Sequence, residues 1–161
     1  TGGTDNHTGM PANGDVNPIG LTGVICDALT TVNIFDALYS RRCYATTGAR
    51  IVGDFTLNGH NMGSEIKLKA FDKRELKIKI NGTAPIECVE VIQNGTTLAE
   101  LPVDGTCDFV QTWSDDRYQR PLEDIYYYVR ARQSDGHCIW LSPIWVDLEE
   151  NDRDLMVPDN R

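Results

Sequence analysis

The opening of the chain holds two side chains that could bind a metal ion. Asp5 and His7 stand two residues apart in a Gly-rich run, where a carboxylate and an imidazole can each give a metal one bond. A catalytic zinc-like site needs about three protein ligands and an open position. Metal chemistry at this pair therefore requires ligands from another domain. For this chain alone we interpret Asp5 and His7 as part of a solvated turn.

Other residues that could do chemistry lack the context that catalysis needs. Four aspartates could offer oxygen ligands to calcium, but their spacing lacks the Gly and terminal Glu of a dedicated calcium loop, so we expect a solvated acidic loop at Asp104, Asp108, Asp115 and Asp116. The serines have no Gly-x-Ser-x-Gly context. His60 and His137 follow Asn-Gly and Asp-Gly pairs, so we predict that both are turn residues.

The cysteines indicate either disulfides or buried thiols, depending on the compartment. In an oxidising compartment they could form two disulfides with one thiol left over, and in a cytosol they would be small buried apolar side chains. The chain has five: Cys26, Cys43, Cys88, Cys107 and Cys138. Because Cys88 begins a strand-like run and Cys107 lies between two others, this pair is the first candidate for a disulfide.

Three Asn-x-Ser/Thr triplets are candidate glycosylation sites, at Asn6, Asn81 and Asn94. The last two precede glycine, and Asn-Gly predicts a turn where a glycan would face solvent. Such triplets often arise by chance, so their presence alone does not establish glycosylation.

Composition indicates one acidic domain and argues against nucleic acid as a partner. The chain has 161 residues, a net charge of −9 and a pI near 4.7, which suits one main core and opposes binding through phosphates. The chain also has no apolar run of the roughly 20 residues that would span a bilayer, and no signal peptide at its N-terminus. The acidic surface suits a secreted protein, and we predict an extracellular or periplasmic location.

The first part of the chain predicts an extended arm and one helix. Residues 1–29 are rich in Gly and Asn and have almost no apolar periodicity. Thr30 can cap a helix within residues 30–43, in which Ile34, Phe35 and Leu38 share one face. We expect Arg41 and Arg42 to close its last turn, near the negative end of the helix dipole.

From residue 44 to residue 148 the apolar pattern changes to a period of two, typical of half-buried antiparallel strands. Lysines alternate with apolar residues near residues 66–70 and 76–80, and Asn94-Gly95 predicts a tight hairpin. The predicted strands cover residues 51–57, 66–70, 76–80, 88–93, 97–101, 109–113, 125–133 and 139–146. This count predicts an antiparallel β-sandwich, Ig-like or jelly-roll-like, followed by an acidic tail at 149–161.

Three consecutive tyrosines, Tyr126 to Tyr128, place their rings on alternate faces of a predicted strand. We expect one face to pack in the core with Trp113 or Trp145. The other face presents tyrosines outward, a feature suited to carbohydrate or protein contact.

Several stretches carry a family resemblance: residues 36–51, residues 58–65, and residues 126–133 with Asp135-Gly136 and residues 142–146. They resemble the C-terminal region of PHP-like metallohydrolases, the polymerase and histidinol phosphatase superfamily of metal-dependent phosphoesterases. In that family a barrel-like N-terminal domain gathers the metal ions, and Asp5 and His7 match its late Asp-x-His element. The resemblance implies a divalent metal (Zn, Mn or Fe) at this pair in the whole enzyme, with residues 1–29 as the remnant of the barrel end. The early His-x-His pair of the family has no counterpart in this sequence.

We therefore interpret the chain as a non-catalytic structural subunit that needs no cofactor by itself. The polar arm could add to a neighbouring sandwich, and repetition of that contact would give an oligomer or a filament. The alternative for the arm is that it folds back over its own helix and sheet. The alternative functions are the C-terminal portion of a metal-dependent phosphoesterase and a glycan-binding module.

Overall fold

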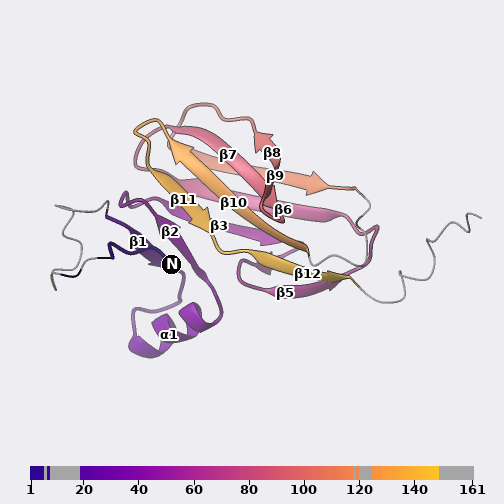
Figure 1. Ribbon diagram of the computed structural model, residues 1–161, viewed down its shortest axis with the longest axis horizontal. Helices are drawn as coiled ribbons and strands as arrows, with labels where there is room; N and C mark the ends of the chain where they lie inside the picture. The colour runs from indigo at the N-terminus through magenta and orange to yellow at the C-terminus, as the bar shows by residue number, and fades with distance from the viewer. Residues whose placement is uncertain (6, 8–18, 118, 120–124, 149–161) are drawn as a thin grey trace, which may run out of the picture.

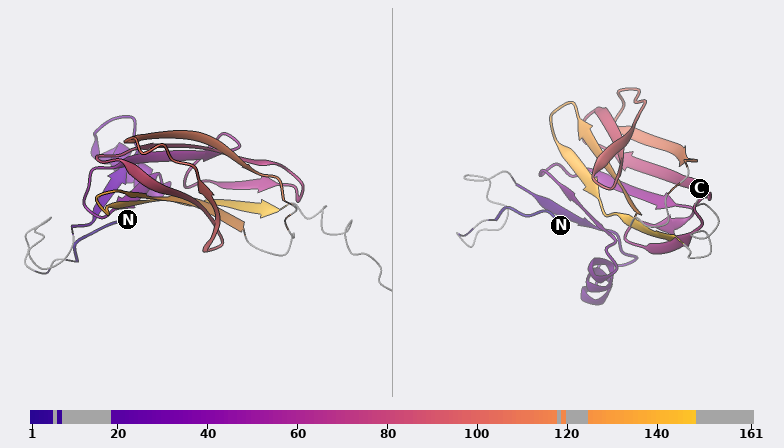
Figure 2. Two further views of the ribbon diagram at one scale, coloured as in Figure 1. Left: turned by 90° about the horizontal axis from the view of Figure 1, so that it is seen from above. Right: turned by 45° about the vertical axis from the view of Figure 1, so that its right-hand side comes forward.

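The computed structural model describes residues 1–5, 7, 19–117, 119 and 125–148. Within these residues the chain forms two packed β-sheets and a helix, α1, that stands apart from both sheets (Figures 1 and 2). The predicted mainly β architecture, an antiparallel β-sandwich with one N-terminal helix, is confirmed. The predicted acidic tail at residues 149–161 lies outside the described residues.

The larger sheet is built around the long strand β10 (Ile125–Gln133). One side of β10 pairs with β7 (Ile86–Gln93), which pairs in turn with β8 (Thr96–Leu101). On the other side, the start of β10 pairs with β12 (Ile144–Leu148) and its end with β11 (Cys138–Leu141). The sheet continues from β11 through β2 (Cys43–Thr46) to β1 (Leu21–Val24), and from β12 to β5 (Glu65–Leu68).

The smaller sheet has four strands in the order β4-β3-β6-β9. They are β4 (His60–Asn61), β3 (Val52–Leu57), β6 (Arg74–Asn81) and β9 (Asp108–Asp115). The turn between β3 and β4 has positive φ angles at Asn58 and Gly59, as does the turn at Asn94 and Gly95. These two Asn-Gly pairs are therefore the tight turns that the sequence predicts.

The core lies between the two sheets and follows the alternation of each strand. In β6, Leu76, Ile78 and Ile80 are buried while Lys77 and Lys79 face solvent, as predicted. The opposing sheet contributes β10 residues such as Val129, together with Ile139 and Leu141 of β11.

A glycine brings the two sheets close together at one point. A Cβ atom at Gly53 of β3 would lie 2.8 Å from the Cδ1 atom of Ile139 and 2.9 Å from the Cδ2 atom of Leu141. Distances below about 3 Å between such atoms require one side chain to move, so this position favours glycine.

Two strand predictions need correction. The strand predicted over residues 139–146 is two strands, because Ser142-Pro143 separates β11 from β12 and proline has no N–H to donate to a ladder. Strand β5 is parallel to β12, whereas the alternation of Ile66 and Leu68 predicts an antiparallel strand. A period of two is common to both orientations, so the sequence pattern could not distinguish them.

The end of the predicted arm is part of the sheet, because β1 pairs with β2 from Leu21 to Val24. Residues near the N-terminus lie beside β1: the Gly2 amide donates to the Thr22 hydroxyl at 2.9 Å, and that hydroxyl donates to the Gly2 carbonyl at 2.8 Å. These contacts agree with an arm that folds back on its own sheet.

Candidate functional site

Helix α1 (Thr31–Tyr39) begins and ends at well-defined caps. The Thr30 hydroxyl accepts a hydrogen bond from the Asn33 amide at 3.2 Å, so the predicted N-cap is confirmed. At the other end the Arg42 amide donates to the Ala37 carbonyl and the Arg41 amide to the Leu38 carbonyl, at 2.8 and 3.0 Å, the pattern of a Schellman motif. The arginines therefore follow the helix and do not close its last turn, which corrects the expectation.

Most of the large apolar residues of α1 and of the loop before it face solvent. The exposed fractions are 67% for Val32, 68% for Phe35 and 82% for Tyr39, and Leu29 and Leu38 add 91% and 38%. Within this helix Ala37 is the buried residue. We call these five side chains the α1 patch. The sequence predicts a shared face for Ile34, Phe35 and Leu38; Phe35 and Leu38 belong to the α1 patch, whereas Ile34 is half-buried. Periodicity cannot show that the sandwich leaves the patch uncovered.

Arg41 links the end of α1 to the larger sheet. Its φ of 58° is a left-handed conformation that glycine usually supplies at this position of a helix end. The side chain donates to the Gly63 carbonyl at 2.9 Å and forms an ion pair with Glu65 at 2.8 Å. Its guanidinium also lies 5.0 Å from the centre of the Trp145 ring, within range of a cation–π contact.

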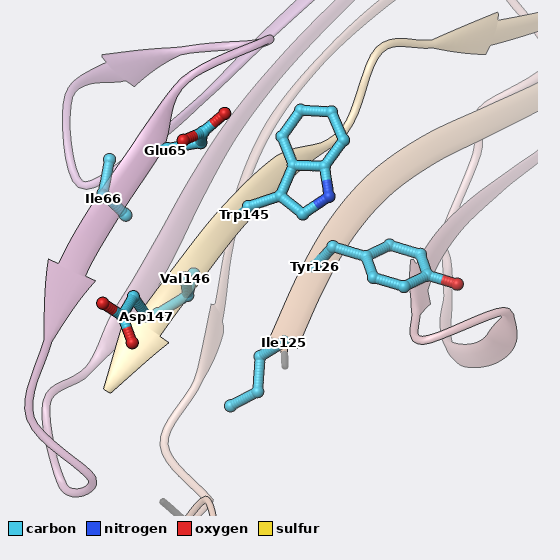
Figure 3. Close-up of a pocket in the computed structure, with 7 residues that line it drawn as sticks. All are labelled: Glu65, Ile66, Ile125, Tyr126, Trp145, Val146 and Asp147. Carbon is cyan, nitrogen blue, oxygen red and sulfur yellow. The ribbon is translucent and has the colours of Figure 1, made fainter. Parts of the chain in front are cut away.

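Trp145 and Tyr126 lie on the outward face of the larger sheet. Register pairs align Glu65 of β5 with Trp145 of β12, and Trp145 with Tyr126 of β10. Figure 3 shows Trp145 between Glu65 and Tyr126 in this row. The prediction that alternate tyrosines point outward is confirmed, because Tyr127 is buried while Tyr126 and Tyr128 are half-buried. Of the two tryptophans that the sequence offered for the core side, Trp113 is the one that packs against the core, and Trp145 lies on the outward face.

The row borders a hollow of about 450 Å³, which we call the Trp145 groove. Its lining residues come from β5, β10 and β12: Glu65, Ile66, Ile125, Tyr126, Trp145, Val146 and Asp147. The two acidic side chains have basic neighbours, since Arg41 pairs with Glu65 and the Lys67 amine lies 4.0 Å from Asp147. The groove therefore combines two outward aromatic rings with locally balanced charge.

Between the two sheets lies a group of polar side chains that we call the inner polar cluster: Arg74, Gln93, Asp115, Arg117 and Tyr127. Arg74 and Asp115 are cross-strand partners on β6 and β9, and their exposed fractions are 0% and 2%. The Tyr127 hydroxyl donates to Asp115 at 2.7 Å and accepts from the Gln93 amide at 3.0 Å. The Arg117 guanidinium donates to Asp115 at 2.9 Å, and Arg74 donates to the Arg117 carbonyl.

This cluster corrects the expectation of a solvated acidic loop at Asp115. Burial alone would raise the pKa of Asp115, but hydrogen bonds from Arg117 and Tyr127 outweigh it and hold the pKa below its ordinary value. Burial, followed by the hydrogen bond to Asp115 and its charge, raises the pKa of Tyr127. The alternation along the strands was a signal for this cluster. Arg74 lies two residues before Leu76, and Asp115 two residues after Trp113, so each charged residue shares a strand face with a core residue.

The other three aspartates are more exposed. Asp104 accepts hydrogen bonds from the Thr106 hydroxyl and amide at 2.7 and 3.0 Å, and these bonds lower its pKa. Asp108 accepts from the Asn81 amide at 2.7 Å. Asp116 is exposed, so a solvent-facing loop position is confirmed for Asp104 and Asp116.

Asp5 and His7 are both exposed near the N-terminus. In the part of the chain that the structure describes, no three His, Cys, Asp or Glu side chains come close enough to hold a metal ion together. Metal binding by this pair in a larger protein stays a prediction, as does the resemblance to PHP-like metallohydrolases.

The predicted turn histidines lie where expected. His60 follows the Asn58-Gly59 turn and is exposed. His137 follows Asp135-Gly136, and its Nδ1 atom lies 2.9 Å from the Thr47 hydroxyl. The two histidines therefore belong to separate hairpins, and neither of them lines the Trp145 groove.

The predicted modification sites have different settings. Asn94 is in a tight turn, whereas Asn81 ends β6 and its amide nitrogen donates to Asp108, so the predicted turn at Asn81 was wrong. Asn6 lies outside the described residues. Cys88 and Cys107 carry free thiols in this structure, as do the other cysteines. Glycosylation and the Cys88–Cys107 disulfide stay predictions.

Sequence comparisons place the chain beside longer chlamydial proteins. A protein of Chlamydia muridarum (strain MoPn / Nigg) is 38% identical over 143 residues, and one of Chlamydia pneumoniae is 36% identical over the same length. Both are described as uncharacterized. Each match covers 80% of this chain and 23% of the relative, so the chain spans about a quarter of the relatives' length. No family model matches the chain.

Comparison with solved structures found a titin M10–obscurin-like 1 Ig complex at 18% identity, covering 61% of this chain and 96% of that chain with a TM-score of 0.37. An engineered protein matches at 12% identity over 60% of this chain and 20% of that chain, also with a TM-score of 0.37. The strand pairings described above, and not these weak likenesses, define the sandwich. Among the described residues, no helix has the length and apolar character that a membrane crossing requires.

Proposed function

We propose that this chain is a structural β-sandwich module that associates with a second copy of itself through the α1 patch. The observation that carries this proposal is the exposure of Val32, Phe35 and Tyr39 on a capped helix. A helix normally buries its apolar stripe against the core, and that burial supplies most of its stability in a protein. An uncovered stripe on an ordered helix is therefore typical of a contact surface.

The size of the α1 patch suits a dimer. Phe35 and Tyr39 are mostly exposed, and because an aromatic side chain buries about 150–250 Å², these two offer on the order of 300 Å². Leu29, Val32 and Leu38 extend the patch toward the upper end of the roughly 300–600 Å² that marks the largest apolar patch on a typical monomer. Two copies would bury about 1,000 Å², near the minimum for a specific interface.

Charge and rigidity also favour a second copy as the occupant. Between Ala28 and Ser40 the chain carries one charged side chain, Asp36, so little repulsion arises at the contact despite the net charge of −9. The Schellman motif and the contacts of Arg41 hold the end of α1 against the sheet. A preformed surface needs less ordering on association, and one self-complementary patch is what a two-fold dimer requires.

Sedimentation velocity of the whole chain tests this proposal over about 1 µM to 1 mM, the range of weak to moderate affinities. We expect a monomer–dimer equilibrium that Val32→Ser and Phe35→Ser each weaken by about tenfold or more, because both remove apolar area from the interface centre. Val110→Ser is the matched control, since Val110 is 76% exposed on β9, away from α1. It should leave the dimer unchanged.

Two results would contradict self-association. The first is a monomer at every concentration, and the second is a dimer that persists equally in Val32→Ser and Phe35→Ser. If a longer protein containing this chain protects α1 from solvent while remaining monomeric, then the occupant is another part of that protein and a second copy is rejected. Hydrogen exchange of the α1 amides, measured in this chain and in the longer protein, shows whether the longer protein covers α1.

A role in assembly agrees with the structural function that the sequence predicts. The finer expectations are part of the proposal: an extracellular or periplasmic location, and growth into a larger oligomer or filament. Contacts between Gly2 and Thr22 of the same chain favour the α1 patch over the N-terminal arm as the contact surface. A phosphoesterase built on Asp5 and His7 stays a prediction for a larger protein.

A further inference from the structure

We infer that the Trp145 groove is a binding site for a neutral saccharide, a function separate from the proposed self-association. The groove lies on the outward face of β5, β10 and β12, and its volume of about 450 Å³ falls within the roughly 300–1,000 Å³ of small-molecule sites. Its outward side chains are the rings of Trp145 and Tyr126 and the carboxylates of Glu65 and Asp147, whereas the side chains of Ile66, Ile125 and Val146 are buried on the core face of the sheet.

Two aromatic rings supply a stacking surface. Trp145 and Tyr126 are direct cross-strand neighbours on β12 and β10, and adjacent strands lie about 4.8 Å apart. Both rings are half-buried, so each keeps one part accessible and is fixed by its surroundings. The apolar C–H face of a pyranose ring can pack on such rings while its hydroxyl groups remain at the edge.

Arg41 helps to hold Trp145 in place. Its guanidinium lies 5.0 Å from the indole ring centre and is anchored by the Glu65 carboxylate and the Gly63 carbonyl. Because Glu65 lies on β5, this contact comes from the side of Trp145 opposite β10. The rotamer of Trp145 is thereby restricted before a ligand binds, which lowers the ordering cost of binding.

Polar groups beside the rings match hydroxyl chemistry. Carboxylate oxygens of Glu65 and Asp147 can accept hydrogen bonds, the indole N–H of Trp145 can donate, and the Tyr126 hydroxyl can do both. The four residues that carry these groups line the groove. Sugar hydroxyls also donate and accept, so they can satisfy this mixed rim without a charge.

The balance of charge selects a neutral ligand. Arg41 lies 2.8 Å from Glu65 and Lys67 lies 4.0 Å from Asp147, so both carboxylates of the groove already have a cationic neighbour and a basic peptide would have to displace it. An anionic ligand would meet the two carboxylates and a protein of net charge −9. A neutral saccharide neither displaces these cations nor is repelled by the negative charge.

Isothermal titration with cellohexaose, maltohexaose and the hexamer of N-acetylglucosamine tests the inference, with hexa-arginine as the probe for a cationic ligand. We expect at least one saccharide to bind with a Kd of about 1 mM or tighter, with little dependence on salt because the ligand has no charge. Trp145→Ala should weaken this binding by about tenfold or more, since it removes the central stacking ring.

Trp140→Ala is the matched control. Trp140 is a half-buried tryptophan on the outward face of β11, paired with Arg130 and absent from the lining of the groove. Its loss should leave saccharide affinity within about twofold. Tyr126→Ala provides a second groove variant if Trp145→Ala unfolds, and circular dichroism of each variant checks the fold.

Three results would overturn the inference. They are the absence of binding by all three saccharides, binding that Trp145→Ala and Tyr126→Ala leave unchanged, and salt-sensitive binding of hexa-arginine alone. Sedimentation of Trp145→Ala separates this inference from the assembly proposal. The groove and the α1 patch share no residue, so a variant that loses saccharide binding should still dimerise.

Discussion

Apolar side chains are usually buried and charged ones exposed, but helix α1 exposes apolar side chains and the inner polar cluster buries charged ones. The helix leaves Phe35 and Tyr39 in solvent, while the sandwich encloses Arg74 and Asp115 at exposed fractions of 0% and 2%. The enclosed carboxylate of Asp115 has partners on both sheets, because it lies opposite Arg74 of β6 and accepts a hydrogen bond from Tyr127 of β10. The exposed rings of α1 have no such partner in the sandwich. The buried charged pair therefore contributes to the fold, whereas the exposed apolar side chains of α1 are available for contact with a partner.

The buried pair is the more sensitive region, and Asp115→Ala should have the largest effect. The change leaves Arg74 buried without its carboxylate, although Arg74 already has two nitrogen atoms, Nε and Nη1, without a hydrogen-bond partner among the described residues. Removing one member of a buried pair costs about 3–5 kcal/mol. Urea unfolding measures this loss. Asp116→Ala, at the exposed neighbouring residue, should cost less than about 0.5 kcal/mol, and equal effects would contradict the comparison.

Acidification should weaken the same region more gradually. The folded pKa of Asp115 lies below its ordinary value, so its contribution to stability is fully present above the unfolded pKa of about 3.9. That contribution is lost as the pH falls through the folded value. Glu90, Asp104 and Asp135 also have lowered pKa values and act in the same direction.

Urea midpoints of the wild type and of Asp115→Asn, measured between about pH 6 and pH 2, isolate the Asp115 contribution. The other carboxylates titrate in both proteins, so the difference between the two curves belongs to Asp115. The stability gap should narrow as the pH falls below about 4. A gap that stays constant would show that the Asp115 charge does not stabilise the fold.

Phe35→Ser should have the smallest effect on the folding of the monomer. Phe35 is 68% exposed, and substitutions at exposed sites usually change the free energy of unfolding by no more than about 0.5 kcal/mol. Urea unfolding at about 1 µM, where a weak dimer dissociates, measures the monomer alone. A loss above about 2 kcal/mol would mean that Phe35 belongs to the core of the monomer, and the contrast between the two regions would fail.

Local rules explain how much of the fold could be predicted. Thr30 supplies a helix cap and Asn94-Gly95 a tight turn through their own backbone and side-chain chemistry, so these features appear where the sequence places them. The alternation around Leu76 and Lys77 shows which face of β6 is buried. Pairing partners do not follow from such patterns, and the parallel pairing of β5 with β12 was missed for this reason.

The candidate site depended on contacts between distant segments. The sequence pattern leaves open whether Trp113 or Trp145 packs on the core side. The outward position of Trp145 follows from the break at Pro143 and from its register with Tyr126 and Glu65. Arg41 reaches it from the end of a helix about 100 residues earlier in the chain, a distance that no local signal spans.

The amino-acid sequence by itself determined the class of elements, because turn chemistry, caps and alternation act over a few residues. It also determined the negative charge of the chain. The tertiary structure alone decided which apolar side chains are covered. Whether Phe35 meets solvent and Asp115 meets an arginine depends on how the sheets and the helix are placed, since burial is a property of neighbours that are far apart along the chain.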